Sequence, residues 1–108
     1  MLSLDGYIRR CRILWLIINF KCAETARIWR REFSRKLPGN IQQKALHKLQ
    51  LLDAAVRLEN LRVPPGNRLE ALKGDRKGQH SIRINQQWRI CFQWISGNAN
   101  EVEIVDYH

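Results

Sequence analysis

The sequence has few of the residues that mark disordered or covalently cross-linked chains. Only three of its 108 residues are proline and only three are cysteine. Cys11, Cys22 and Cys91 form no C-x-x-C pair. Their spacing therefore signals neither a zinc site nor a disulfide framework, and reduced thiols in cytoplasm fit it best. With 44% hydrophobic and 27% charged residues, the composition is typical of one soluble globular domain.

The sequence also lacks a long hydrophobic run. The longest, residues 13–18, is well below the ~20 apolar residues that a membrane-spanning helix needs. Basic residues precede it, as in a signal peptide, but residues 19–21 (Asn-Phe-Lys) stand where a small-residue cleavage site would be expected. The β-branched and aromatic residues favour a buried strand over residues 13–20, with a targeting or membrane-surface segment as the alternative. We expect no membrane contact.

Acidic residues are outnumbered everywhere except at the end of the chain. Lys and Arg number 19 against 10 Asp and Glu, which gives a formal net charge of +9 and a pI near 10.2. All the basic residues lie before residue 94, and residues 94–108 carry only Glu101, Glu103 and Asp106. Such a surface attracts polyanions, nucleic acid and the ribosome among them, although a basic surface that merely aids solubility is the plainer explanation.

The first half of the chain predicts two helices. Residues 24–36 place apolar side chains at helical spacing among arginines, and Pro38-Gly39 ends this segment. Asn40 can cap a second helix that ends near Leu61, before the proline-rich turn that follows. The apolar faces consist of Ile28, Trp29 and Phe33 in the first helix and of Ile41, Ala45, Leu49, Leu52 and Val56 in the second.

The last third predicts strands, because apolar and polar side chains alternate there with a period of two. Short polar segments between them are typical of tight turns. We expect strands over residues 81–84, 88–94 and 101–105, with turns at residues 85–86 and 96–98.

In sequence order these elements give β-α-α-β-β-β. This order indicates an α+β domain, in which a small antiparallel β-sheet has two N-terminal-half helices packed on one face. We expect residues 17–108 to form this domain and residues 1–16 to be an N-terminal extension of uncertain status.

Period-two geometry places two functional candidates on the side of the sheet opposite the helices. If the apolar neighbours of Arg89 point toward the helices, Arg89 must point to the open side. By the same alternation, Tyr107 lies outward just beyond the last strand. We therefore expect Arg89 and Tyr107 to converge on one exposed surface. The loop residues Lys73, Arg76 and Lys77 can reach this surface and would make it cationic.

A cationic surface beside a phenol and an imidazole suits cleavage of an RNA strand without a metal ion. The 2′-hydroxyl must lose a proton, the phosphorus must gain negative charge, and the leaving 5′-oxygen must be protonated. Arg89 and Lys73 can stabilise the added charge, since both bind phosphate oxygens. His108 is the natural acid or base. Tyr107 can stack on a base or share in proton transfer, and Asp106 can orient an imidazole or act as a base.

Each of these residues also has a plainer explanation. Arg89 can be an exposed cation that pairs with an acid such as Glu103. Residues 106–108 can be a frayed end of the chain. Trp88 and Trp94 are more typical of core aromatics than of base-stacking platforms. Spacing alone therefore leaves the site open.

The stretch "PPGNRLEALKGDRKGQHSIRINQQWRICFQW" and the ending "VEIVDYH" carry an ordered set of motifs: L-x-x-L-x-G-x-R-x-G-x-x-S-I-R, W-R-I-x-F and a terminal D-Y-H. With these motifs the sequence resembles the HigB group of the RelE/ParE toxin superfamily over about residues 17–108. The resemblance implies the toxin of a type II toxin-antitoxin pair, a metal- and cofactor-independent endoribonuclease that cuts messenger RNA in the ribosomal decoding site. It also implies a HigA-like helix-turn-helix antitoxin as partner, with operator DNA contacted only through that complex.

The resemblance also assigns residues. The positions that match the active-site pattern of the family are Lys73, Arg89, Asp106, Tyr107 and His108. We further expect substrate contacts from Arg68, Arg76, Lys77, His80 and Arg83.

The sequence departs from the family in one pair of residues. Some relatives have His-Pro before the Leu-Lys-Gly segment, where this chain has Glu70-Ala71. One proton-transfer candidate is therefore absent, and His80 or Glu70 would have to replace it.

Two other functions are compatible with the sequence. The ParE-like branch of the superfamily poisons DNA gyrase and shares the fold, although the presence of Lys73, Arg89, Tyr107 and His108 argues against it. The second alternative is a non-catalytic module that binds RNA or operator DNA through phosphates.

Overall fold

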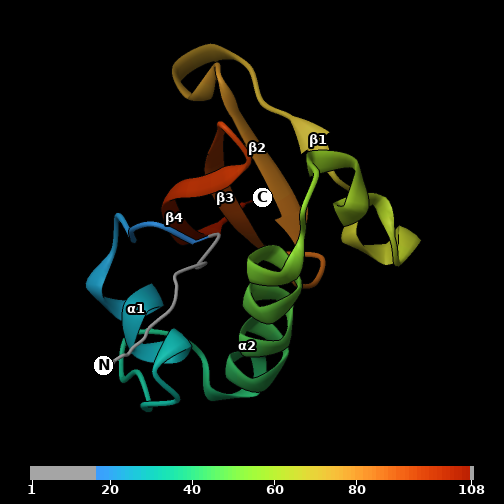
Figure 1. Ribbon diagram of the computed structural model, residues 1–108. Helices are drawn as coiled ribbons and strands as arrows, with labels where there is room; N and C mark the ends of the chain where they lie inside the picture. Colours follow the sequence, from blue (N-terminus) through green and yellow to red (C-terminus); the bar gives the residue numbers. More distant parts are fainter. Residues whose placement is uncertain (1–16, 108) are drawn as a thin grey trace, which may run out of the picture.

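The computed structural model describes residues 17–107 of the chain. One antiparallel sheet of four strands, in the order β1-β2-β3-β4, forms a layer that packs against two helices, α1 and α2 (Figure 1). The predicted α+β class is therefore confirmed. The bounds are Ala23–Trp29 (α1), Gly39–Ala54 (α2), Glu70–Ala71 (β1), Gln79–Arg83 (β2), Trp88–Ile95 (β3) and Asn98–Asp106 (β4), with short 3-10 helices at Leu58–Arg62 (η1), Pro65–Asn67 (η2) and Gly74–Arg76 (η3).

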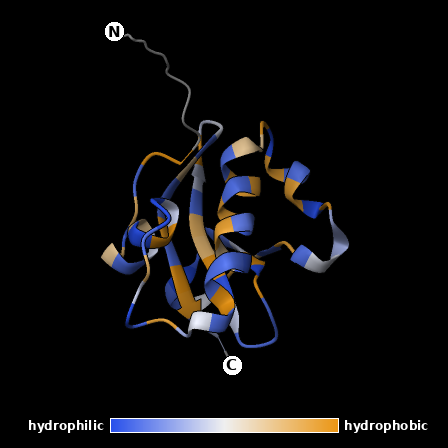
Figure 2. Cartoon of the chain, turned by 90° about the horizontal axis from the view of Figure 1, so that it is seen from below, coloured by the Kyte–Doolittle hydropathy of each residue, from blue (hydrophilic) through white to orange (hydrophobic). Residues whose placement is uncertain are grey.

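The core lies between the sheet and the helices. Ile82 on β2, Ile90 and Phe92 on β3, and Val102 on β4 are fully buried, because alternation turns all four toward the helices. Figure 2 shows apolar residues recurring along the strands and the helix that lie side by side. Burial of each such side chain contributes about 1.5–3 kcal/mol. The helical side of the core comes from Ile28, Ile41, Ala45, Leu49 and Leu52.

Both predicted turns are confirmed. Between β2 and β3, the side-chain oxygen of Asn85 accepts hydrogen bonds from the backbone N–H groups of Gln87 and Trp88, each at 2.8 Å. Asparagine is typical of such turns because its side chain can replace a backbone acceptor. Between β3 and β4, Ser96 and Gly97 have φ values of 51° and 80°, as a tight two-residue hairpin turn requires.

A bulge interrupts the alternation of β4. Two residues, Glu101 and Val102, lie opposite the single residue Phe92, because the pairing shifts between Cys91 and Gln93. Glu101 takes a positive φ of 54°, and a bulge of this kind bends the strand and re-aims its side chains. Strict period-two counting along the whole of β4 would therefore misplace the side chains on one side of the bulge.

The first helix is shorter than predicted. It ends at Trp29, and Arg31 then adopts a positive φ of 64°, a conformation that stops a helix. Phe33, predicted on the apolar helix face, is 69% exposed in the connection to α2. The buried hydroxyl of Ser34 donates to Glu24 of α1 at 2.7 Å. This hydrogen bond holds the segment between α1 and α2 against α1, where the sequence predicted that the helix would continue.

The second helix also ends early. It stops at Ala54, and the predicted end near Leu61 falls instead in η1, which still buries Leu61. Val56 is exposed, although the helical stripe predicted it inside. Asn60 explains the break, since its side-chain oxygen accepts the backbone N–H of Val56 at 3.1 Å and competes with helical bonding. At the other end, a proline occupies the cap position instead of Asn40.

Of the first strand, predicted over residues 13–20, the structure describes residues 17–20, which form no named strand. Ile17 and Phe20 form isolated parallel bridges to Ala99 and Val102 of β4. Residues 13–16 of this predicted strand lie outside the described residues. The predicted extension at residues 1–16 lies outside them as well.

Candidate functional site

Polar side chains occupy the face of the sheet that the helices leave open. Across β2 and β3, Ser81 pairs with Cys91 and Arg83 pairs with Arg89. Across β3 and β4, Cys91 pairs with Glu103. Paired residues point to the same side of a sheet, so these five side chains share one face. The prediction that Arg89 points away from the helices is confirmed.

Arg89 is less exposed than the sequence suggested. Only 8% of the residue is accessible. Its Nε donates a hydrogen bond to the hydroxyl of Ser81 at 2.7 Å, and its Nη2 donates to the backbone carbonyl of Arg68 at 2.7 Å. These bonds fix the plane of the guanidinium and compensate its removal from water. Because a guanidinium has five N–H donors, Arg89 retains donors that bind no other group within residues 17–107.

Tyr107 covers the guanidinium of Arg89. The Cζ atom of Arg89 lies 5.6 Å from the centre of the Tyr107 ring, within the range of a cation–π contact. The backbone N–H of Tyr107 donates to the carbonyl of Gln87 at 2.6 Å. The predicted convergence of Arg89 and Tyr107 is therefore confirmed, and residue 107 is held against the sheet instead of fraying.

Glu70 is the acid that accompanies Arg89. The short strand β1 pairs Glu70 with Ser81, and this register brings its Oε1 to 3.6 Å from Nη2 of Arg89. The Glu70 side chain is 52% exposed, whereas that of Arg89 is 10% exposed. An ion pair of this length with one solvated partner is weak. The sequence suggested Glu103 as the acid, but Glu103 binds a different arginine.

That arginine is Arg76, which reaches the open face from the loop before β2. Its Nη1 donates to Glu103 at 2.9 Å and to the side-chain oxygen of Gln79 at 3.0 Å. The hydrogen bond to Glu103 raises the pKa of Arg76 further above its ordinary value. Lys21 lies 3.7 Å from the same carboxylate. The predicted cationic surface is therefore partly neutralised.

Cys91 lies beneath this network and is fully buried. Burial raises the pKa of its thiol above the ordinary value, the neighbouring charge of Arg76 opposes that rise, and Glu103 adds to it. A neutral, buried thiol is a poor nucleophile. Cys91 therefore packs against the site and takes no part in its chemistry.

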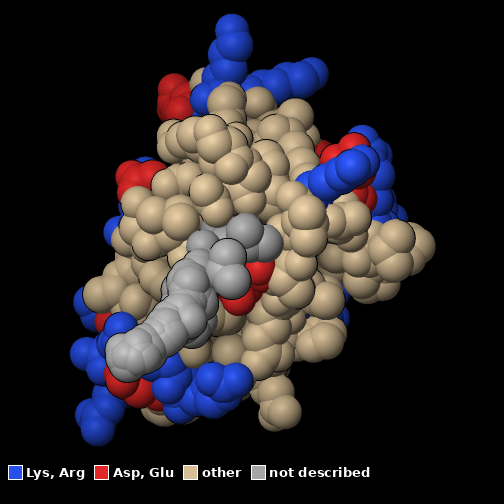
Figure 3. Space-filling view, in the orientation of Figure 1, with Lys and Arg blue, Asp and Glu red and all other residues tan. Residues whose placement is uncertain are grey.

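Four other predicted residues lie at the edge of this face. Lys73 and Lys77 flank η3, and both are exposed. The loop that carries them is at the top of Figure 1, where Figure 3 shows a group of basic side chains. Arg68 has an exposed side chain, and only its backbone carbonyl contacts Arg89. Arg83 is half-buried, and its Nε donates to the carbonyl of Asn85 at 3.1 Å.

His80 is not brought to the open face. It pairs with Phe92, whose side chain points toward the helices. The imidazole stacks on the Phe92 ring with 6.3 Å between the ring centres. The structure thus separates His80 from Arg89, and of the two substitutes that the sequence offered for the missing histidine of the family, only Glu70 contacts Arg89.

Asp106 and His108 complete the predicted set. Asp106 pairs with Trp88 and accepts a hydrogen bond from the side-chain amide of Gln87 at 3.1 Å. Alternation directs Asp106 to the opposite side of the strand from Tyr107. His108 lies outside the described residues.

Sequence reasoning missed Ser81 and the carbonyl of Arg68. Ser81 could have been found, because the hairpin register places it two positions from the partner of Arg89 on the same face. The carbonyl of Arg68 had no sequence signal, since any residue type supplies one.

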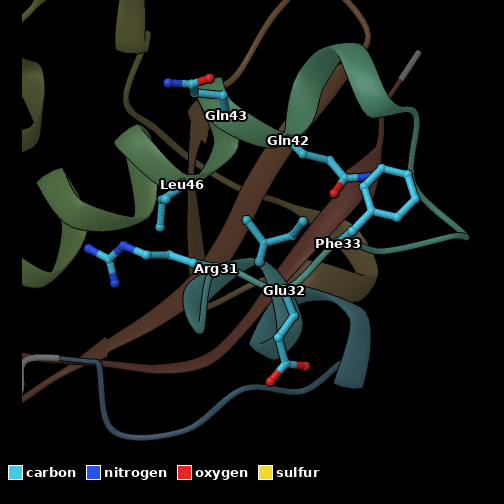
Figure 4. Close-up of a pocket in the computed structure, with 7 residues that line it drawn as sticks. Arg31, Glu32, Phe33, Gln42, Gln43 and Leu46 are labelled. Atoms are coloured by element: carbon cyan, nitrogen blue, oxygen red, sulfur yellow. The ribbon is translucent and has the colours of Figure 1, made fainter.

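A separate hollow of about 290 Å³ lies between α1 and α2 and contains none of the predicted site residues. Figure 4 shows Phe33 and Gln42 at one side of it and Leu46 and Arg31 at the other. Gln42 is fixed there, since its amide donates to the carbonyl of Ser34 at 2.7 Å.

The open face is therefore built for an anion. It holds a guanidinium in fixed orientation, a phenol against it, and a loosely bound carboxylate that an incoming anion could displace. Among residues 17–107, no group of three His, Cys, Asp or Glu side chains is arranged to hold a metal ion. Within the same range, no helix is long and apolar enough to cross a membrane.

The α+β fold is that of RelE-like toxins. Residues 19–108 match the family described as the RelE-like toxin of type II toxin-antitoxin system HigB. The chain belongs to this family. It is thus the toxin half of such a system, and the family implies an antitoxin as its partner.

Two named relatives agree with this assignment. The chain is 49% identical to "Toxin HigB-1" of Vibrio cholerae over 65 residues, which cover 60% of this chain and 68% of the relative. It is 31% identical to "Endoribonuclease HigB" of Proteus vulgaris over 93 residues, which cover 86% of this chain and 100% of the relative. An uncharacterized protein of Haemophilus influenzae is 31% identical over 62% of this chain and 66% of its own length.

Proposed function

We propose that this toxin is a ribosome-dependent messenger RNA endonuclease that inhibits translation in the cytoplasm. The observation that carries the proposal is the oriented guanidinium of Arg89 beneath the ring of Tyr107 on the open face of the sheet. The relative from Proteus vulgaris is named an endoribonuclease, and the match with this chain covers the whole length of that relative. The excess of basic residues suits a ribosomal target.

Arg89 binds the scissile phosphate in this proposal. Ser81 and Arg68 fix the orientation of its guanidinium before substrate arrives. The N–H groups of Arg89 that bind no other group within residues 17–107 would contact the phosphate, where negative charge develops. Such preorganised donors are the main source of stabilisation for a charged transition state. The Oε1 atom of Glu70, 3.6 Å from Nη2 of Arg89, occupies the position that the phosphate would take. The Glu70 side chain is half exposed, so it can move away when the phosphate binds. Lys73 supplies a second positive charge from the loop.

Proton transfer falls to the end of the chain. Tyr107 positions or deprotonates the nucleotide, since its phenol belongs to the ring that covers the guanidinium. His108 is the acid or base, because an imidazole titrates near neutral pH. Asp106 acts through His108, as a group that orients the imidazole. Arg68, Arg76, Lys77 and Arg83 would contact the flanking RNA.

The remaining partners follow from this activity. The antitoxin that the family implies would be a HigA-like helix-turn-helix protein, through which the pair contacts operator DNA. The ribosome would present the messenger RNA to the toxin.

The test is to map transcript ends after brief induction of the toxin, with and without translation. We expect cuts that depend on translation, and we expect Arg89→Ala to reduce cleavage by more than about 100-fold. Arg35→Ala, which removes an exposed arginine from the connection between the helices, is the matched control and should cleave normally. Thermal melting of both variants separates loss of chemistry from loss of fold.

Two results would contradict the proposal. Cleavage that persists without ribosomes would remove the ribosomal dependence. DNA breaks that require gyrase, in the absence of any RNA cleavage, would assign the toxin to the other branch of the superfamily.

A further inference from the structure

A second group of cations lies at the turn between β2 and β3. A cavity of about 330 Å³ opens there between α2, η2 and the turn, and Figure 1 shows this turn beside α2. Lys44, Lys48 and Arg83 line the cavity, together with Gly66 and residues 84–86. No acidic residue within the described part of the chain lines it.

Lys48 is the unusual member of the group. It is only 7% exposed, and its ammonium donates to the side-chain oxygen of the buried Asn67. The amide nitrogen of Asn67 is committed to the carbonyls of Leu61, at 3.1 Å, and Val63, at 3.3 Å. The oxygen of Asn67 is therefore held toward Lys48. This built arrangement orients the ammonium but does not neutralise its charge.

The surroundings of Lys48 disfavour that charge. Burial lowers the pKa of Lys48, and the neighbouring charge of Lys44 lowers it further. A buried charge without an opposite charge destabilises a fold, and an apolar residue of similar size usually serves as well. An anion in the cavity would offset both effects.

Arg83 joins this cavity to the face that holds Arg89. The two arginines are direct partners across β2 and β3, and like charges in directly opposed positions destabilise a sheet. Among residues 17–107, Arg83 bonds only the neutral carbonyl of Asn85, at 3.1 Å. The arrangement is therefore more favourable with anions bound along it than without them.

We propose that the cavity lined by Lys44, Lys48 and Arg83 is a second phosphate-binding site. It holds a backbone phosphate of the same strand whose scissile phosphate lies at Arg89, one strand of the sheet away. That the strand is RNA rests on the proposed function, whereas the preference for phosphate rests on the cations alone. Arg83 is the bridge between the two positions.

The test measures binding of an uncleavable 2′-O-methyl oligoribonucleotide to the full chain across a range of salt concentrations. A plot of log affinity against log salt has a negative slope. We expect Lys44→Gln and Lys48→Met each to make this slope shallower by about 0.7, the value for one lost phosphate contact on a single strand. Lys36→Gln removes an exposed lysine outside the cavity and should leave the slope unchanged. Inorganic phosphate should compete only weakly, because it can fill one site and not two.

Unchanged slopes in both cavity variants would overturn the inference, as would full competition by inorganic phosphate or tighter binding of an oligoglutamate peptide. Melting curves identify a variant that fails to fold, and Lys44→Gln, at an exposed position, then decides alone. If both slopes become shallower but no transcript is cut in cells, the phosphate site stands and the proposed function fails. If transcripts are cut but the slopes do not change, the proposed function stands and the second phosphate site is ruled out.

Discussion

The two faces of β3 are both buried, but different forces order them. On the helix side, the side chains of Ile90 and Phe92 belong to the hydrophobic core and are fully buried. On the open side, Arg89 is nearly as inaccessible, yet hydrogen bonds to Ser81 and Arg68 hold it. Apolar packing tolerates exchange of one hydrophobic residue for another of similar volume. A buried polar network loses its geometry when one member is removed.

The difference explains why one sheet can serve both stability and chemistry. The helix side supplies the free energy of folding and needs no particular orientation of any single group. The open side gains little stability from Arg89 but fixes the direction of its donors. Substitutions on the two sides should therefore differ in whether they change the stability of the fold or its activity.

The largest loss of stability should come from the helix side. Phe92→Ala removes a fully buried ring and should lower the free energy of unfolding by about 3–5 kcal/mol. Phe33→Ala removes an aromatic ring that is 69% exposed and should change it by less than about 0.5 kcal/mol. Urea unfolding followed by tryptophan fluorescence measures both. Equal losses would contradict the placement of the core.

A smaller loss should follow from cutting the network on the open side. Ser81→Ala leaves the Nε–H of Arg89 without its acceptor and should cost about 1–3 kcal/mol. Because Arg89 also loses its orientation, cleavage should fall by more than the loss of folded protein explains. Ser81→Thr retains the hydroxyl and is the control. If Ser81→Ala cleaves as well as Ser81→Thr does, the bond to Ser81 has no role in positioning Arg89.

The pH dependence of stability tests the environment of Cys91. Its pKa is raised in the folded state, so the unfolded chain releases the thiol proton first as the pH rises through the ordinary thiol pKa of about 8.5. Stability should therefore fall between that pH and the higher pKa of the folded protein. Urea unfolding at a series of pH values should show this fall in the wild type and less of it in Cys91→Ala. Equal falls in the two proteins would mean that Cys91 titrates normally.

On the open side, the smaller effect on stability is expected at Glu70. The two charged groups of its ion pair with Arg89 are 3.6 Å apart, and the Glu70 side chain is about half exposed to solvent. Glu70→Gln should therefore change the free energy of unfolding by less than about 1 kcal/mol. If Glu70 only occupies the place of the phosphate, this variant should bind RNA more tightly and still cleave it. A loss of cleavage of about 100-fold or more would instead make Glu70 a proton-transfer group.

Local patterns predicted much of this architecture. The alternation around Arg89 and the stripe on α2 identified the correct inner faces, and Asn85 and Gly97 identified the turns. The same local reasoning failed where a side chain competes for backbone hydrogen bonds. Asn60, for example, ends the helical conformation after Ala54 although the apolar spacing continues.

The candidate site was predictable only where it depends on strand geometry. Arg89 and Tyr107 lie on one face because period two puts them there, and they meet. His80 was predicted to contact substrate, but its position on β2 turns it to the core side. Its neighbour Ser81, one residue further along the strand, is the one that binds Arg89.

The sequence by itself determined which side of each strand is apolar, how basic the surface is, and that Arg89 and Tyr107 face the same way. These properties follow from side-chain chemistry and a repeat of two residues. Only the tertiary structure decided that Arg89 bonds the carbonyl of Arg68, 21 residues away, and that Arg76 neutralises Glu103, 27 residues away. Contacts at such separations depend on the path of the loops between them, and no local spacing encodes that path.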